Sequence, residues 1–102
     1  MSEQAVIVRF IYGQTDLDPL YELEDKLIAA IEAAGAGEFD GNEVATDGSD
    51  GILYMYGPDA DRLLGAVRAV LASASCMQKA VATIRYGPPE DGVKEREVAI
   101  DS

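Results

Sequence analysis

The chain contains no histidine, no tryptophan and a single cysteine, Cys76. Histidine is the commonest general base and the commonest transition-metal ligand, so its absence removes the usual centre of acid–base and metal chemistry. A lone cysteine without a cysteine or histidine partner is typical of a small buried apolar residue rather than a nucleophile. The sequence also lacks a P-loop, a dinucleotide-binding glycine motif and a nucleophile elbow. We therefore expect no catalytic residue, no cofactor and no enzyme activity.

Positive charge is scarce. Eight lysines and arginines stand against 19 acids, which gives a formal net charge of −11, and no basic residue occurs between Lys26 and Arg62. Binding to nucleic acid requires clustered basic residues that displace counterions, so we expect no nucleic-acid partner and, by the same argument, no anionic membrane. The acidic charge is compatible with two classes of partner, basic proteins and divalent cations. The charge can also serve solubility alone.

Long apolar runs are absent as well. No segment approaches the roughly 20 apolar residues that span a bilayer. The first residues, 1–4, lack the basic start and apolar stretch of a signal peptide. Apolar residues nevertheless make up 48% of the chain, which is ordinary for a globular protein with a real core. We expect one domain, residues 1–102, in the cytoplasm.

The first elements are expected to be a strand and a helix. Residues 5–12 are β-branched, aromatic and almost wholly apolar, which indicates a strand in the middle of a sheet. Asp18 is a favoured N-cap and Pro19 suits the first helical position. Apolar residues then recur at spacings of three and four as far as Ala34, which predicts an amphipathic helix. Gly35 is placed to end it.

Similar patterns predict the remaining elements. Turn-forming residues fill 46–51, between a weaker and a stronger strand pattern, which indicates a hairpin. A second amphipathic stripe follows Asp59, which can cap that helix. Glycine and prolines follow residue 86, and the last strand carries Lys94 and Arg96, which discourage pairing at a sheet edge. The expected strands here span residues 38–45, 52–56, 80–86 and 93–100.

The order of these elements is strand, helix, strand, strand, helix, strand, followed by one further strand. The economical fold for this order is a ferredoxin-like βαββαβ sandwich of the α+β class, an antiparallel sheet with two helices on one face, plus a C-terminal edge strand. The usual spatial order of its first four strands is 4-1-3-2. That order places the first and third strands in the centre, and these are the two most apolar strands of the sequence.

Three acids are expected to meet at one end of this sandwich, and we call them the acidic pole: Asp40, Asp59 and Asp61. Pairing around the turn at 46–51 places residue 40 opposite Gly57, within one or two residues. Grouped carboxylates can bind Ca²⁺ or Mg²⁺, or they can cap the second helix and complement its dipole. The ligand spacing of a calcium loop is absent, so we predict capping and no metal ligand.

One face of the sheet is left without helices. Alternate residues of the first and fourth strands point to it, and we call this set the candidate interaction face: Ile7, Arg9, Ile11, Val81, Thr83 and Arg85. Either Tyr54 and Tyr56 or Leu53 and Met55 join them. Apolar and arginine side chains in such a mixture suit a protein interface, most simply that of a symmetric homodimer. An ordinary exposed sheet has the same composition, so both interpretations stay open.

Three segments carry a resemblance to known sequences. Residues 37–43 (GEFDGNE), residues 53–61 (LYMYGPDAD) and residues 85–88 (RYGP) resemble a group of small bacterial proteins of unknown function. The resemblance covers most of the chain. It implies a free-standing bacterial cytoplasmic domain, and it implies no activity, cofactor or catalytic residue.

Two functions are compatible with these features. The first hypothesis is a non-catalytic protein-interaction or regulatory module, whose acidic surface docks a basic protein. The alternative is a small-ligand sensor that uses the open sheet face or the cleft of a dimer, since Arg9, Arg85 and Thr83 on one face can hold a carboxylate.

Overall fold

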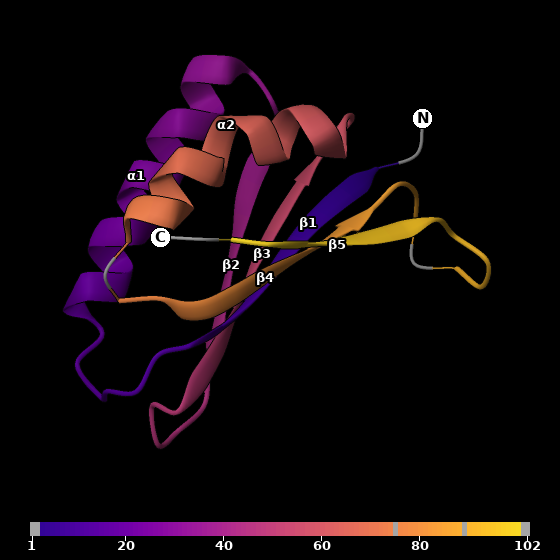
Figure 1. Ribbon diagram of the computed structural model, residues 1–102. Helices are drawn as coiled ribbons and strands as arrows, with labels where there is room; N and C mark the ends of the chain where they lie inside the picture. Colours follow the sequence, from indigo (N-terminus) through magenta and orange to yellow (C-terminus); the bar gives the residue numbers. More distant parts are fainter. Residues whose placement is uncertain (1–2, 75, 89, 101–102) are drawn as a thin grey trace.

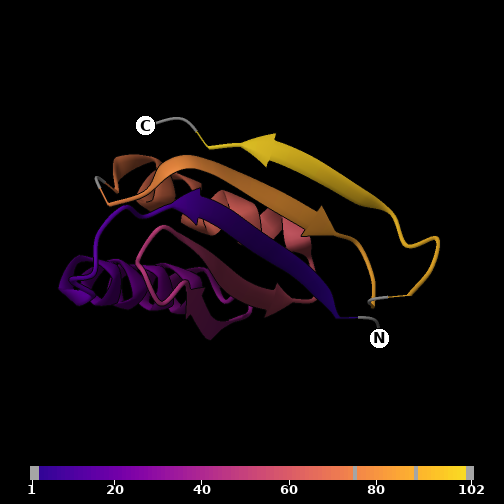
Figure 2. The same ribbon diagram turned by 90° about the horizontal axis from the view of Figure 1, so that it is seen from below.

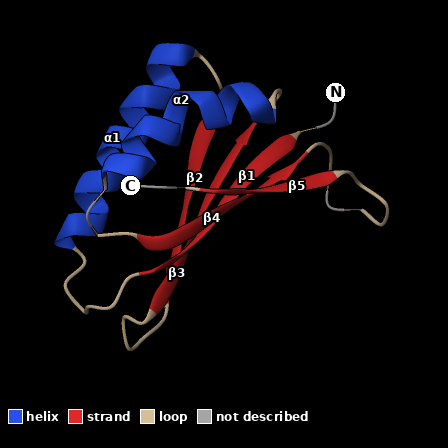
Figure 3. Cartoon of the chain, in the orientation of Figure 1, coloured by secondary structure: helices blue, strands red, loops and turns tan. Residues whose placement is uncertain are grey.

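Strands and helices alternate along the chain in the computed structural model, which describes residues 3–74, 76–88 and 90–100 (Figure 1). The elements are β1 (Gln4–Ile11), α1 (Asp18–Ala34), β2 (Glu38–Val44), β3 (Asp50–Gly57), α2 (Ala60–Ser73), β4 (Gln78–Arg85) and β5 (Glu95–Ala99). Figure 3 shows that both helices lie on the same side of the sheet. Within the described residues, neither helix has the length and apolar character that crossing a membrane requires.

The five strands form one sheet in the order β2-β3-β1-β4-β5, and every neighbouring pair is antiparallel. The first four strands therefore have the order 4-1-3-2 of a ferredoxin-like sandwich, and β5 adds an outer strand beside β4. The predicted fold is confirmed. The two most apolar strands, β1 and β3, occupy inner positions, because a central strand must bury side chains on both faces.

The core lies between the helices and one face of the sheet. From β1, Val6 and Val8 are fully buried, and from β3, Leu53 and Met55 are fully buried. Against them pack the apolar stripes of the helices, which include Leu20, Leu27 and Ile31 of α1 and Leu63, Val67 and Leu71 of α2. Burial of Leu53 and Met55 decides which residues of β3 reach the other face. They are the tyrosines, Tyr54 and Tyr56, both only partly buried.

The helix ends follow local rules. Gly35 ends α1 in the left-handed conformation (φ 59°), as predicted, and Asp59 caps α2, accepting a hydrogen bond from the backbone N–H of Arg62 at 3.2 Å. The prediction that Asp18 is the N-cap of α1 is wrong by one residue, because the N-cap is Leu17. Asp18 is already helical, and its backbone N–H donates to the carboxylate of Asp16 at 3.0 Å. A nearby aspartate thus supplies the acceptor that the first turn lacks.

The register between β2 and β3 differs by about two residues from the prediction, which placed residue 40 opposite Gly57 within one or two residues. Strand β3 begins at Asp50, so the connecting loop is shorter than the predicted turn at 46–51. An irregularity in β2 between Phe39 and Gly41 shifts the pairing by a further residue. Asp40 sits at this bulge, opposite the junction of Met55 and Tyr54, because a bulged residue has no partner of its own across the ladder.

Gly57 instead lies against the end of the α1–β2 connection. A Cβ built on Gly57 would come within 2.2 Å of the carbonyl oxygen of Ala36, and one built on Gly37 within 2.1 Å of the carbonyl oxygen of Tyr56. The backbones approach closely here, and only glycine permits that approach.

Candidate binding face of the sheet

The sheet face away from the helices carries the predicted interaction residues. Ile7 pairs with Thr83 and Arg9 with Val81 across β1 and β4, while Arg85 pairs with Ala5. These residues alternate with buried ones, so they share the open face. Ile11, at the end of β1, is 43% exposed and is one of the most exposed large apolar side chains in the described chain. Figure 2 shows the sheet from below, with β1 in the middle, between β3 and β4.

The centre of this face is hollowed. A hollow of about 440 Å³, which we call the β1–β4 hollow, lies over the inner strands. Its lining comprises Arg9, Phe10, Ile11, Asp50, Gly51, Ile52, Lys79, Val81, Thr83 and Glu97. Four residues of the candidate interaction face thus line it: Arg9, Ile11, Val81 and Thr83. Ile7 and Arg85 do not, and the Nε of Arg85 donates to the carbonyl of Gly87 at 2.7 Å, so this guanidinium is tied to its own turn.

Sequence analysis missed Lys79, Asp50 and Glu97 as lining residues. Lys79 precedes the strand predicted at 80–86, although β4 begins at Gln78. Its backbone is left-handed (φ 53°), which is uncommon for a residue other than glycine. Sequence carries no signal for this conformation, because lysine has no preference for it. Asp50 was placed in a turn, and the charge of Glu97 gave no indication of its face.

The outer part of the same face is aromatic and acidic. A second hollow of about 410 Å³ lies over β2 and β3, with a lining that comprises Asp40, Gly41, Asn42, Glu43, Tyr54 and Tyr56. Burial raises the pKa of Tyr54, and the neighbouring Glu43 carboxylate raises it further. The phenol of Tyr54 therefore stays protonated at neutral pH and remains a hydrogen-bond donor on this face.

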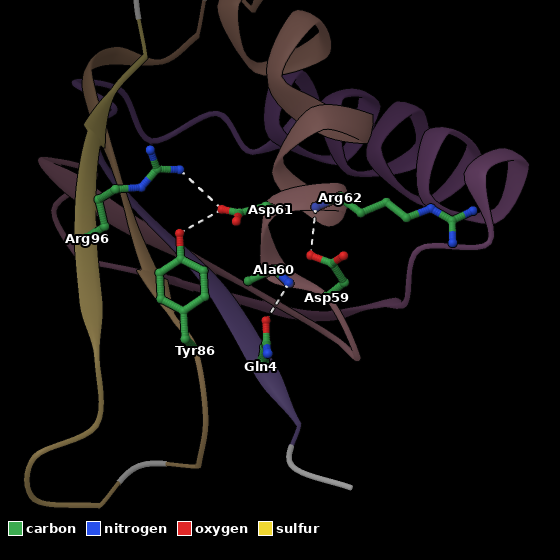
Figure 4. A network of polar contacts seen from close by, with 7 residues as sticks. All are labelled: Gln4, Asp59, Ala60, Asp61, Arg62, Tyr86 and Arg96. Atoms are coloured by element: carbon green, nitrogen blue, oxygen red, sulfur yellow. Dashed lines mark hydrogen bonds and ion pairs between the residues drawn. The ribbon is translucent and has the colours of Figure 1, made fainter.

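The acidic pole is divided between two places. Asp59 and Asp61 lie at the start of α2 (Figure 4), whereas Asp40 belongs to the second hollow over β2 and β3. The carboxylate of Asp61 accepts a hydrogen bond from the Tyr86 hydroxyl at 2.6 Å and lies 3.2 Å from the Arg96 guanidinium.

Beside them, the side-chain oxygen of Gln4 accepts from the backbone N–H of Ala60 at 2.8 Å. Gln4 of β1, Tyr86 directly after β4 and Arg96 of β5 therefore converge on the first turn of α2 (Figure 4). Within the described ranges, no three acidic or cysteine side chains are grouped as metal ligands. The carboxylates of Asp59 and Asp61 are engaged with backbone, phenol and guanidinium groups, which is a structural role.

Comparisons with known proteins concern the fold. No protein-family model and no curated protein matches the chain. The chain is similar to a solved structure titled "Structure of Rv0793 from Mycobacterium tuberculosis", at 19% sequence identity and a TM-score of 0.50. The match covers 96% of this chain and 94% of the mycobacterial chain. At this identity the likeness shows a shared ferredoxin-like arrangement and nothing about activity.

Proposed function

We propose that the protein is a non-catalytic interaction module that binds a basic protein through the open face of its sheet. The observation that carries this proposal is the open face itself. It combines partly exposed aromatic and aliphatic side chains with Arg9, while the helices cover only the other face. Aromatic residues and arginine are the types enriched at protein interfaces.

Charge supports a basic partner. Acidic residues border the apolar centre of the face on both outer strands: Glu43 pairs with Ile52 on one side and Glu97 with Thr83 on the other. An apolar centre with a charged border is the usual anatomy of an interface. With a net charge of −11, the protein attracts a basic surface over long range and orients it during the encounter.

The same proposal includes the setting of the module. We place it in the cytoplasm, among the small bacterial proteins that share its GEFDGNE and LYMYGPDAD segments. The sequence without histidine supports a role in binding rather than in catalysis. A second copy of the chain is an alternative occupant of the face, and sedimentation velocity of the purified protein distinguishes a dimer from a monomer.

Capture of a partner by the immobilised protein tests the proposal. The extract of the producing cells is first passed over a cation exchanger, and the retained basic proteins are offered at low salt. We expect wild type and Tyr21→Ser to retain the same protein, because Tyr21 is 51% exposed on α1, away from the sheet. Tyr54→Ser should lose it, and higher salt should weaken it by screening. Equal retention by both variants would refute the open face as the contact surface.

A second candidate function is the binding of a small ligand. The observation in its favour is the β1–β4 hollow, whose volume of about 440 Å³ lies within the usual range of ligand sites, about 300–1,000 Å³. Arg9, Lys79 and Thr83 supply hydrogen-bond donors to it, and aliphatic side chains supply an apolar floor. A melting temperature that rises with a specific metabolite would support this function, because ligand binding stabilises the native state.

A further inference from the structure

We propose that the β1–β4 hollow binds a small zwitterion with an apolar side chain, which is the chemistry of an aliphatic α-amino acid. The proposal rests on the small-ligand function above and names its ligand class. It follows from where the hollow places its basic, acidic and apolar side chains.

The basic residues of the hollow are Arg9 on β1 and Lys79 on β4. Within residues 3–74, 76–88 and 90–100, no acid forms an ion pair within 4.0 Å with Arg9 or Lys79. A guanidinium and an ammonium group that line one hollow are suitable partners for a carboxylate, which accepts charge-assisted hydrogen bonds from both.

The backbone at this point is irregular on both inner strands. Lys79 has a left-handed φ of 53°, and the β1–β4 register shifts between Arg9 and Ile11. Sparsely populated backbone conformations concentrate at sites where function holds a side chain in position. Here the irregularities lie on facing strands and accompany the two basic residues of the hollow.

Two acids also line the hollow. Asp50 lies on β3 and Glu97 on β5, and the strand order β3-β1-β4-β5 places each acid one strand away from a basic residue. Asp50 pairs with Ile11, two residues from Arg9 along β1, and Glu97 pairs with Thr83, two residues along β4 from Val81, the partner of Arg9. A ligand carboxylate at Arg9 and Lys79 therefore leaves its ammonium group facing Glu97 or Asp50.

The overall charge of the protein favours a neutral ligand. A net charge of −11 repels a simple carboxylate during its approach, whereas a zwitterion carries no net charge and is not repelled. The remaining lining is aliphatic, from Ile11, Ile52 and Val81, and it removes an apolar side chain from water. The net charge of the protein and the aliphatic lining of the hollow together favour a zwitterion with an aliphatic side chain.

Thermal shift and calorimetry with leucine and three matched compounds test the proposal. 4-Methylpentanoate lacks the amino group of leucine, 3-methylbutan-1-amine lacks its carboxyl group, and glycine lacks its side chain. We expect leucine, or valine or isoleucine in its place, to raise the melting temperature at millimolar concentration. Each matched compound should bind at least about tenfold more weakly, since it leaves a charged or apolar part of the hollow without a partner.

Variants locate the binding. Arg9→Gln and Lys79→Asn should abolish the shift, and asparagine tolerates the left-handed backbone at residue 79. Arg68→Gln, which removes the same charge from the exposed surface of α2, should retain it. Melting of each variant without ligand shows that it is folded.

Three results would overturn the proposal: no shift with any aliphatic amino acid, an equal shift with 4-methylpentanoate, or a full shift in Arg9→Gln. None of them affects the capture experiment, in which loss of the protein partner by Tyr54→Ser tests the interaction module separately.

Discussion

Tyr86 donates a hydrogen bond from its hydroxyl to Oδ1 of Asp61, with the two oxygens 2.6 Å apart. The same carboxylate oxygen lies 3.2 Å from Arg96 of β5, so the first turn of α2 is joined to both strands of the C-terminal hairpin (Figure 4). Lys94 also lies over the Tyr86 ring, 5.6 Å from its centroid. These contacts explain why a partly exposed tyrosine follows β4, and they give Asp61 a structural role.

We expect Tyr86→Phe to lower the melting temperature at pH 7, because the variant cannot donate to Asp61. The hydrogen bond to Asp61, together with burial, raises the pKa of Tyr86 above its usual value of about 10. The stabilisation is therefore present below about pH 10 and is lost as the pH rises through the raised pKa. Thermal melts from pH 7 to 11 should show the difference from wild type shrinking. Tyr21→Phe, at an exposed position, serves as the control, and a constant difference would contradict the assignment.

The Asp59 carboxylate caps α2, and we predict that it binds no cation. Asp59→Ala should cost about 1 kcal/mol of unfolding free energy, whereas Asp59→Asn should cost much less, because asparagine caps helices as well as aspartate does. Urea denaturation measures both, and EDTA should leave the wild-type midpoint unchanged. A loss with Asn equal to that with Ala, together with a lower midpoint in EDTA, would indicate a bound cation.

Two glycines should respond to alanine in opposite directions. Gly57→Ala places a Cβ within 2.2 Å of the Ala36 carbonyl oxygen, so the backbone must shift, at a cost of about 1–3 kcal/mol. Gly65 lies within α2, and nothing is within 4 Å of its Cβ position. Gly65→Ala should therefore stabilise the protein by about 0.5–1 kcal/mol. Chemical denaturation of both variants checks this, and stabilisation by Gly57→Ala would contradict the close backbone approach.

Cys76 should react slowly in the folded protein. Its thiol is buried and donates to the carbonyl oxygen of Pro19 at 3.8 Å, and burial raises its pKa. Because the thiolate is the reactive form, we expect a disulfide reagent to modify Cys76 much more slowly at pH 8 in the native state than in urea. The absorbance of the released thiol gives both rates. Equal rates would show that the thiol is accessible.

The sheet and its helices could be predicted because local patterns and global packing agree. The apolar stripes of both helices, the stop at Gly35 and the cap at Asp59 are local signals, and the fold uses each of them. The position of Asp40 could not be predicted in this way. A bulge shifts the register by one residue, and its signal in residues 38–45 is Gly41, because a glycine inside a strand suggests a bulge without fixing the pairing.

The candidate site was predictable only in part, for a related reason. Alternation placed Arg9, Val81 and Thr83 on one face, and the register confirms that they lie together. Lys79 joins them because its backbone is left-handed, and Glu97 joins them because β5 pairs with β4. Both depend on contacts between segments that are distant in sequence, which composition and periodicity do not encode.

Labelling of the tyrosines tests most directly whether the open face is the contact surface. Nitration followed by peptide mass spectrometry measures the extent of nitration of each tyrosine separately. For each tyrosine, the extent in buffer is compared with the extent in the presence of the basic-protein fraction of the native extract. Tyr54 and Tyr56 lie on the open face, Tyr21 is 51% exposed on α1, and Tyr12 is buried. We expect the basic-protein fraction to protect Tyr54 and Tyr56 from nitration and to leave the nitration of Tyr21 unchanged. Protection of Tyr21 alone, or of no tyrosine, would contradict it.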